Sequence, residues 1–506
     1  MDKVTMDEQQ RKAIETTEGP VLLIAGPGAG KTYTLVERIV RILVDKHVRP
    51  EELLVTTFTH KAAMELQTRI TERLQAGQIS VPLHEMYLGT MHSVFLKILD
   101  KYRDVTGLRK GFRLADDFES HYIIYKNLKE FLAIPDAIDL TIDDNRWKQV
   151  TPVSQSARLL SWINKVSDEC ISVNRLLESG VPHLEALGNV YELYIRLLQE
   201  LNAVDFGLIQ TMMYRLLNEH PQICRELSDT FRYIMIDEYQ DTSTVQERIF
   251  MLLAGTHRNI CVVGDDDQSI YRFRGATVTN LLEFQNQFQS GCTVVPLETN
   301  YRSHPRIVRF YSAWINGCRW EENDHCFRMP KKLNTHKEDA DRTTRVIRCS
   351  GRNVEDWCEE VYRLLRTLRE SGVIADWNQI AFLFRSVKHP EVRSLASSLE
   401  ARGIPVYAPR TGQFFERKEI RYSLGALTAL IYPFSDKDRI PDYFIGAFQA
   451  FGEMAQADPA MVQWVKEMRS ALKEGHVVSA FSFSKSFYQL LSFDPYYQML
   501  QLESYV

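Results

Sequence analysis

A short glycine-rich segment near the start of the chain limits the possible folds more than any other feature. Residues 25–32 (AGPGAGKT) follow the apolar stretch 21–24 (VLLI) and precede an amphipathic stretch at 35–43. A strand, such a loop and a helix in this order form a phosphate-binding loop. Glycine lets backbone N–H groups approach phosphates, and the helix N-terminus favours an anion. The chain is therefore expected to bind ATP.

The nucleotide-binding residues expected from this loop are Ala25, Gly26, Pro27, Gly28, Ala29, Gly30, Lys31 and Thr32. Lys31 is expected to reach the β- and γ-phosphates, and the Thr32 hydroxyl to bind Mg²⁺. Ala25 replaces the first glycine of the strict pattern. An ordinary glycine-rich turn before a helix is the alternative, and the adjacent Lys-Thr pair argues against it.

An acidic pair, Asp237 and Glu238, follows the apolar run 233–236 (YIMI). Asp237 is expected to hold Mg²⁺ through water, and Glu238 to orient or deprotonate the attacking water. Two adjacent acids are more often part of a solvated surface. Their place after a buried strand, with a phosphate-binding loop upstream, favours the catalytic interpretation.

A third polar loop, residues 264–276, follows the apolar run 260–263. Gln268 in this loop suits sensing of the γ-phosphate. Tyr271, Phe273 and Arg274 offer flat surfaces on which bases can stack. Aromatic packing at a domain joint is the alternative for each aromatic ring.

The apolar runs that precede these loops predict an α/β fold with a parallel sheet. Continuous hydrophobicity at 21–24, 53–55, 233–236 and 260–263 indicates strands buried on both faces. In such sheets ligands bind at the carboxyl ends of the strands, where the polar residues of this chain fall.

Three other regions have a different pattern. Residues between about 95 and 205 show helical spacing without a nucleotide motif, which predicts a helical insertion that splits the first domain. The charged stretch 319–342 is expected to be an exposed loop. An apolar helical face at 354–368 lies among strand candidates and predicts a second α/β domain. These strand candidates are Thr293–Leu297, Arg345–Cys349, Ile380–Phe384 and Pro405–Tyr407.

Composition adds little to the functional prediction. A chain of 506 residues is long enough for two to four domains. The formal net charge of -5 gives no indication of nucleic acid, although a basic or aromatic groove can exist in an acidic protein. No apolar run approaches 18 residues, so we expect a cytoplasmic protein without a membrane segment.

In order and spacing, these blocks resemble the superfamily-one DNA helicases of the UvrD/Rep/PcrA type over about residues 6–425. The resemblance implies that Gln10 reads adenine. It also implies that segments 56–65 (TTFTHKAAME) and 89–93 (GTMHS) contact single-stranded DNA. In 300–303 (NYRS), Tyr301 is expected to stack on adenine and Arg302 to reach the γ-phosphate.

His60 replaces the asparagine usual in the family, and Phe273 stands where tryptophan is common. The residues expected to bind DNA are Phe58, Thr59, His60, Thr90, His92, Tyr271, Phe273 and Arg274. The expected catalytic residues are Lys31, Asp237, Glu238, Gln268 and Arg302, with Thr32 and Asp237 at Mg²⁺.

The family resemblance also implies a domain layout and an activity. Residues 1–95 and 205–285 would form a split RecA-like motor domain, with 96–204 as its helical insertion. Residues 286–413 would form part of a second motor domain, and 414–506 the truncated start of a second helical insertion. ATP would bind between the motor domains, and movement along single-stranded DNA would run 3′ to 5′. Single-stranded DNA and duplexes with a 3′ single-stranded tail are the expected partners.

Two later family blocks, which resemble TxHxAKGLE and YVAxTRA, do not occur between Tyr422 and Val506. The second block supplies another arginine to the phosphates, and loss of such an arginine can cost orders of magnitude in rate. We therefore expect the 506-residue chain to be an amino-terminal portion or a reduced variant of a helicase. It should bind ATP and DNA but hydrolyse ATP weakly. Robust 3′ to 5′ unwinding by the purified chain would contradict this expectation.

Three classes of function remain open from the sequence. The first is a DNA-stimulated ATPase and helicase, favoured by the intact Lys31, Asp237, Glu238 and Gln268. The second is a DNA- or partner-binding module that uses ATP as a switch without productive translocation. The third, a helicase-nuclease subunit, would need a nuclease domain outside these residues.

Overall fold

The computed structural model describes most of the chain, in segments separated by short gaps. The described residues are 6–142, 151–255, 257–272, 275–289, 291–322, 325–338, 346–387, 389–407, 418–431, 442–456 and 459–474. The chain divides into two compact units, Met1–Val346 and Ile347–Val506.

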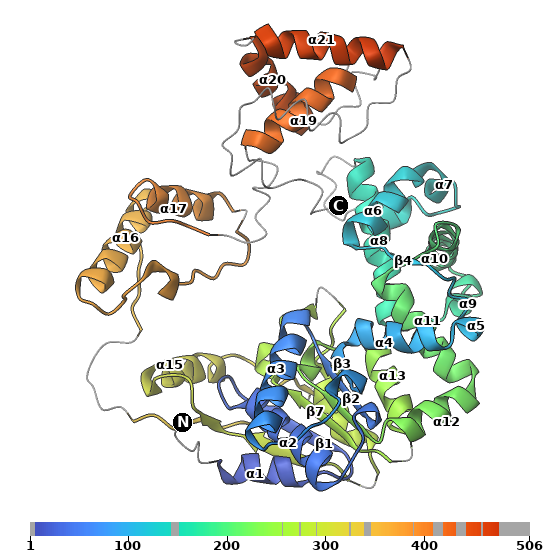
Figure 1. The fold of residues 1–506 in the computed structure, drawn as a ribbon, viewed down its shortest axis with the longest axis vertical. Coiled ribbons are helices and arrows are strands. Elements are labelled where there is room, and N and C mark those ends of the chain that lie inside the picture. The colour runs from blue at the N-terminus through green and yellow to red at the C-terminus, as the bar shows by residue number, and fades with distance from the viewer. Residues whose placement is uncertain are drawn as a thin grey trace. The chain divides into compact units, whose positions relative to one another are not determined.

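A six-stranded parallel sheet forms the centre of the first unit, in the order β3-β2-β6-β7-β1-β8 (Figure 1). The strands are β1 (Val21–Ala25), β2 (Leu53–Thr57), β3 (Tyr87–Thr90), β6 (Tyr233–Ile236), β7 (Ile260–Gly264) and β8 (Thr293–Leu297). The four strands predicted from continuous hydrophobicity are therefore confirmed. All five residues of β1, β2 and β7 are buried, as expected for strands covered on both faces.

Alternate residues of the strands enter two separate hydrophobic clusters. Leu23, Val55 and Met235 pack in one cluster with helices α2 (Lys31–Asp45) and α3 (His60–Ala76). The other cluster takes Leu22, Leu54 and Ile234. They pack with residues of helices α4 (Met91–Lys101), α11 (Phe206–Glu219), α12 (Pro221–Thr230) and α13 (Thr244–Ala254). This alternation follows from the two-residue repeat of a strand, so both faces of the sheet are covered.

The chain between β3 and β6 is almost entirely helical (Figure 1). Its helices are α4 (Met91–Lys101), α5 (Arg103–Thr106), α6 (Asp117–Lys126), α7 (Leu128–Leu132), α8 (Pro152–Asp168), α9 (Val173–Leu177), α10 (Pro182–Glu200), α11 (Phe206–Glu219) and α12 (Pro221–Thr230). A short parallel pair, β4 (Arg113–Leu114) and β5 (Ala203–Val204), joins its two ends. After β6 come α13 (Thr244–Ala254) and α14 (Thr279–Glu283). No helix among the described residues is both long and apolar enough to cross a membrane.

After residue 290 one interpretation of the sequence was wrong, and another was right only for part of its stretch. The strand Thr293–Leu297 was grouped with a second domain, but as β8 it pairs in parallel with β1 and closes the first sheet. The stretch 319–342 was expected to be an exposed loop, but part of it packs tightly in the described segments. The side chain of Lys331 there is only 4% exposed. Both differences arose because long-range pairing has no local signature.

The remainder of the first unit returns to the sheet region after α15 (Pro305–Asn316). A short antiparallel pair, β10 (Glu321–Glu322) and β11 (His325–Cys326), follows this helix. Then β12 (Asn334–Thr335) pairs in parallel with β9 (Thr299–Asn300), which directly follows β8. The segment after β11 therefore lies beside the chain that leaves the sheet.

The second unit contains two helical groups in the residues that the structure describes. Helices α16 (Val354–Glu370), which confirms the predicted apolar helix, and α17 (Pro390–Glu400) share one small core. Helices α19 (Lys418–Ile431), α20 (Asp442–Gln456) and α21 (Pro459–Lys473) share another.

The other strand candidates of the second domain did not form as predicted where they are described. Residues 346–349, 380–384 and 405–407 have no strand assignment in the structure, and Arg345 lies outside the described residues. A strand needs a hydrogen-bonded neighbour, and no ladder partner occurs for these segments among the described residues of this unit. The apolar pattern marked them as extended but could not supply that partner.

A buried arginine fastens helix α1 (Glu8–Glu15) to helix α2. The residue Arg38 is 1% exposed. Its Nη1 donates to the carbonyl oxygen of Ala13 (2.6 Å) and to that of Thr16, and its Nη2 donates to that of Thr17 (3.3 Å). These carbonyls lie at the C-terminal end of α1, where helical acceptors lack partners within the helix.

We predict that Arg38→Met lowers the free energy of unfolding by about 2–4 kcal/mol, because buried carbonyls left without donors cost about 1–3 kcal/mol each. Arg41→Met is the matched control, since Arg41 forms only a surface pair with Asp45 and is 39% exposed. That pair contributes about 0–1 kcal/mol. Urea unfolding of both variants checks the prediction, and equal destabilisation by the two substitutions would contradict it.

Candidate nucleotide site and nucleic-acid interface

Three functional loops meet because their strands are neighbours. Strand β7 lies between β1 and β6, so the loops after these three strands leave the same edge of the sheet. These loops carry the phosphate-binding segment, the acidic pair and the Gln268 segment. A parallel sheet binds ligands at this carboxyl edge. The predicted catalytic residues of the first domain are therefore brought together.

The geometry of the phosphate-binding loop requires glycine at two positions. Gly28 and Gly30 have φ angles of 71° and 81°, a region that residues with a Cβ rarely adopt. A Cβ at Gly28 would lie 2.8 Å from the side chains of Asn300 and Arg302. At Gly30 it would lie 2.7 Å from Nε2 of Gln10. Both glycines therefore allow other functional segments to approach the loop.

The loop lysine is paired with the acidic pair. Nζ of Lys31 lies 3.0 and 3.2 Å from the two carboxylate oxygens of Glu238. Glu238 has a φ angle of 52°, which is strained for a residue with a side chain. Nε2 of Gln240 donates to Glu238 Oε2 at 2.7 Å. Glu238 is thus held by two donors at the edge where a triphosphate would bind.

Asp237 fits the predicted role of a magnesium-binding carboxylate. It is 9% exposed at the end of β6, and its Oδ1 accepts a hydrogen bond from the backbone N–H of Glu238 (3.1 Å). Burial and then the charge of Glu238 raise its pKa to about 6, while Lys31 lowers it. A buried carboxylate beside a second acid favours a nearby cation. Thr32 is the second residue of α2, directly after Lys31. When bound here, Mg²⁺ would neutralise phosphate charge.

Gln268 is oriented by a neighbouring aspartate. Its Nε2 donates to Oδ2 of Asp265 at 2.6 Å. Asp265 is fully buried, and its backbone N–H donates to Oε1 of Gln240 at 3.0 Å. Gln240 therefore bridges the Gln268 loop and Glu238. The sequence argument gave Gln240 no role, although it lies two residues after Glu238.

The residues expected to contact adenine lie next to the phosphate-binding loop. Gln10 is 2% exposed, and its Nε2 donates to the carbonyl of Ala29 at 3.3 Å. The Tyr301 hydroxyl donates to Oδ2 of Asp7 at 2.8 Å. The ring of Tyr301 also contacts His336, with centroids 4.9 Å apart. Direct contact of Gln10 and Tyr301 with adenine stays a prediction.

Residues 300–302 connect directly to the backbone of the phosphate-binding loop. Asn300 Nδ2 donates to the carbonyl oxygen of Pro27 at 2.5 Å. The N–H of Tyr301 donates to the carbonyl oxygen of Gly28 at 3.0 Å. Arg302 follows on the exposed side, with its Cβ near Gly28. Asn300 fixes this segment on the loop, although its place in the sequence pattern predicted no role for it.

Two of the expected DNA-binding aromatics form a pair. The rings of Phe58 and Tyr271 lie 4.9 Å apart, tilted by 31°. Phe58 follows β2 and Tyr271 follows β7, so two strands place this platform. Phe273 and Arg274 lie outside the described residues.

The remaining expected DNA contacts all lie at helix starts, but the side chain of one of them is buried. Thr59 and Thr90 are the N-caps of α3 and α4, and each side chain accepts a backbone N–H. His60, the first residue of α3, is exposed. In contrast, Nε2 of His92 is buried and has no hydrogen-bond partner among the described residues, and burial lowers the pKa of His92 to about 4. The His92 ring packs edge-on against Phe206 at 4.9 Å, so contact with DNA stays a prediction.

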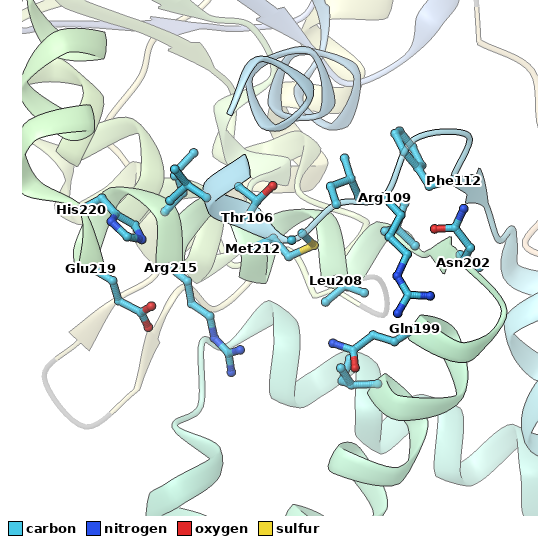
Figure 2. A pocket seen from close by; sticks show the side chains of 17 residues that line it. Thr106, Arg109, Phe112, Gln199, Asn202, Leu208, Met212, Arg215, Glu219 and His220 are labelled. Carbon is cyan, nitrogen blue, oxygen red and sulfur yellow. The ribbon is translucent and has the colours of Figure 1, made fainter. Parts of the chain in front are cut away.

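A separate cavity of about 450 Å³ lies in the helical region, between the loop after α5 and helices α10 and α11 (Figure 2). Its polar lining includes Arg109, Gln199 and Arg215. None of the expected nucleotide- or DNA-binding residues lines this cavity. It is therefore not the candidate nucleotide site.

A parallel sheet with a phosphate-binding loop, an acidic pair and a glutamine loop at its carboxyl edge defines a P-loop nucleotide-binding protein with a RecA-like core. Two family models extend this assignment. The UvrD/REP helicase N-terminal domain matches residues 6–289, and the UvrD-like helicase C-terminal domain matches residues 295–439. The chain belongs to the UvrD/Rep helicase family.

Similar curated proteins include three described as ATP-dependent DNA helicase PcrA. The protein of Leuconostoc citreum is 29% identical over 428 residues, which cover 85% of this chain and 53% of that protein. The Bacillus subtilis (strain 168) protein is 30% identical over 84% of this chain and 53% of that protein. A Staphylococcus epidermidis protein is 30% identical over 84% of this chain and 54% of that protein. The chain thus spans about half the length of these relatives.

The helical region contacts the loop after β7 through an acidic side chain. Asp168, at the end of α8, accepts a hydrogen bond from Gln210 at 3.4 Å. A Cβ at Gly275 would lie 2.4 Å from its Oδ2, so its carboxyl group touches the chain just after Tyr271. Burial raises the pKa of Asp168 from 3.8 to about 7, and the Gln210 hydrogen bond lowers it.

This carboxyl group should make stability depend on pH. Between pH 3.8 and about 7 the folded chain holds a proton that the unfolded chain releases, so stability falls as pH rises through this window. We predict that Asp168→Asn raises the melting temperature relative to wild type at pH 8, and that this gain shrinks towards pH 4. Exposed Asp229→Asn is the control. A gain that is the same at both pH values would contradict this prediction.

Proposed function

We propose that the chain binds ATP with Mg²⁺ and hydrolyses it only weakly on its own, and that this hydrolysis serves 3′ to 5′ movement along single-stranded DNA in a DNA helicase. One observation carries the proposal. The loop after β7 carries Gln268, which is linked through Asp265 and Gln240 to Glu238. Three residues later it carries Tyr271, whose ring lies tilted beside that of Phe58. A change at the phosphate can therefore move an aromatic platform through three residues of backbone.

Each residue of the site has a defined task in this proposal. When ATP binds, the Lys31 ammonium leaves the Glu238 carboxylate and pairs with the β- and γ-phosphates. The Glu238 carboxylate is then free to orient water as a general base. Arg302 approaches from the segment fixed by Asn300 and stabilises charge on the γ-phosphate. Thr32 and Asp237 would hold Mg²⁺, which supplies charge neutralisation.

Movement requires that the grip on DNA alternates with the nucleotide state. The Phe58–Tyr271 pair offers stacking that is independent of base identity, worth about 1–3 kcal/mol for each base. Because Gln268 and Tyr271 share one loop, loss of the γ-phosphate would change the aromatic grip. We further propose that a duplex with a 3′ single-stranded tail is the substrate for unwinding, as the family resemblance implies.

A second candidate is a binding module that ATP switches without translocation. The pairing of Lys31 with Glu238 and the hydrogen bond from Tyr301 to Gly28 favour it, because the chain's own groups already occupy the loop. ATP would replace these contacts and so change the conformation without turnover. Measured turnover separates the two candidates.

The test is steady-state ATP hydrolysis by the 506-residue chain, with and without oligo-dT. We predict that oligo-dT stimulates hydrolysis by the wild type. Glu238→Gln should lower kcat by about 10²–10⁴-fold, the range for loss of a general base, while a fluorescent ATP analogue still binds. Lys31→Ala should lose analogue binding, and exposed Lys110→Ala should behave as wild type.

Analogue binding without DNA-stimulated hydrolysis would support the switch and overturn the motor. The direction of movement is tested separately, with duplexes that carry either a 3′ or a 5′ tail. Unwinding of the 5′-tailed duplex alone would contradict the proposed polarity.

A further inference from the structure

Three successive aspartates beside the nucleotide site surround one lysine. Nζ of Lys331 lies 2.5 Å from Asp265 Oδ1, 2.6 Å from Asp266 Oδ1 and 3.1 Å from Asp267 Oδ2. The Lys331 side chain is 4% exposed, and those of the aspartates are between 0% and 10% exposed. We call Lys331 and Asp265, Asp266 and Asp267 the lysine–aspartate cluster.

The charges in this cluster depend on one another. Burial by itself lowers the pKa of Lys331, but attraction to Asp265 and Asp266 outweighs it and raises the pKa. Burial raises the pKa of Asp266, and Lys331 lowers it. Removal of one partner from such a buried group leaves uncompensated charge, which is strongly unfavourable. Lys331 therefore brings one positive charge into contact with three adjacent carboxylates.

Asp265 connects this cluster to the nucleotide site. Its Oδ1 meets Lys331 and accepts the N–H of Asp267 (3.2 Å), while its Oδ2 accepts Nε2 of Gln268 (2.6 Å). The N–H of Asp265 donates to Gln240, which donates to Glu238. A continuous series of contacts thus runs from Lys331 to both Gln268 and Glu238.

A second cation anchors the segment that carries Lys331. Arg328 donates from Nε and Nη2 to the two oxygens of Asp267, at 2.7 and 3.0 Å. Its guanidinium also donates to Asn316 (2.6 Å) and lies over the ring of Trp320. Arg328 therefore holds the segment in place, whereas Lys331 is the residue that touches Asp265.

The two sides of the cluster come from different family domains. Asp265 and Gln268 lie in the part matched by the N-terminal domain model, and Lys331 lies in the part matched by the C-terminal domain model. Contact between these two parts therefore holds the Asp265 side chain in place.

We propose that Lys331 is a positioning residue for ATP hydrolysis. By fixing Asp265, it orients Gln268 towards the γ-phosphate and supports Glu238 through Gln240, so that hydrolysis requires the 326–337 segment to be docked. The predicted effect on ATP hydrolysis rests on the proposed function, whereas the predicted effect of Lys331 on the order of the Asp265 loop does not.

The catalytic test compares Lys331→Met with Lys332→Met, which removes the same charge from the exposed neighbour. Lys331→Met should lower kcat for oligo-dT-stimulated ATP hydrolysis by about 10-fold or more, with KM for ATP changed less than about 3-fold, as expected for lost transition-state positioning. Lys332→Met should match wild type. Addition of Asp266→Asn to Lys331→Met should restore part of kcat, because it removes one uncompensated charge.

A simple packing role for Lys331 would not give that rescue. Unchanged kcat in Lys331→Met, or a double variant no better than the single one, would overturn the proposal.

A second measurement does not need ATP hydrolysis. Amide hydrogen exchange over residues 264–269 should accelerate in Lys331→Met but not in Lys332→Met, because the N–H groups of Asp265, Asp267 and Gln268 are held within this network. Unchanged exchange would overturn the proposal even if the wild type hydrolysed no ATP. Faster exchange with an inactive wild type would support the contact and reject the proposed motor function instead.

Discussion

The crowding of carboxylates at one edge of the sheet is the physical constraint on which the rest of this structure depends. Burial, and then the charge of Glu238, raise the pKa of Asp237 to about 6 and that of Asp241 to about 7. Lys31 opposes both shifts. Buried carboxylates are unfavourable unless a cation or donor meets them, so every cation near this edge has an electrostatic role before any ligand arrives.

This constraint explains why nucleotide binding would rearrange the site. Lys31 cannot hold Glu238 and the phosphates with the same ammonium group. When it turns to a triphosphate, Glu238 loses one donor and keeps the other, Gln240. The carboxylate is then still oriented but less neutralised, which is the state that a general base needs. The strained φ of Glu238 is consistent with this demand, because strain is commonly retained at functional sites.

The sequence predicted the parts of the structure that have a local signature. The loop 25–32, the acidic pair after β6 and the four buried strands each follow from neighbouring residues. Their meeting at one edge also follows, since parallel strands place their carboxyl ends together. The pairing of β8 with β1 and the burial of Lys331 could not be predicted in this way. Both depend on contacts between residues that lie tens of positions or more apart in the sequence. In the sequence alone, a buried lysine within a charged stretch cannot be distinguished from a solvent-exposed lysine.

The same distinction explains where coupling between ATP and DNA can arise. Local motifs place each group at the sheet edge, but only long-range contacts join the groups into one network. Lys331 contacts Asp265, and Asp265 accepts a hydrogen bond from Gln268. Three residues after Gln268 the chain reaches Tyr271, whose ring contacts Phe58. A buried ionic contact of this kind is sensitive to small displacements, because loss of one partner leaves charge without compensation. The loop after β7 is therefore the element through which a change at the phosphates, or in the docking of residues 326–337, would reach a bound strand.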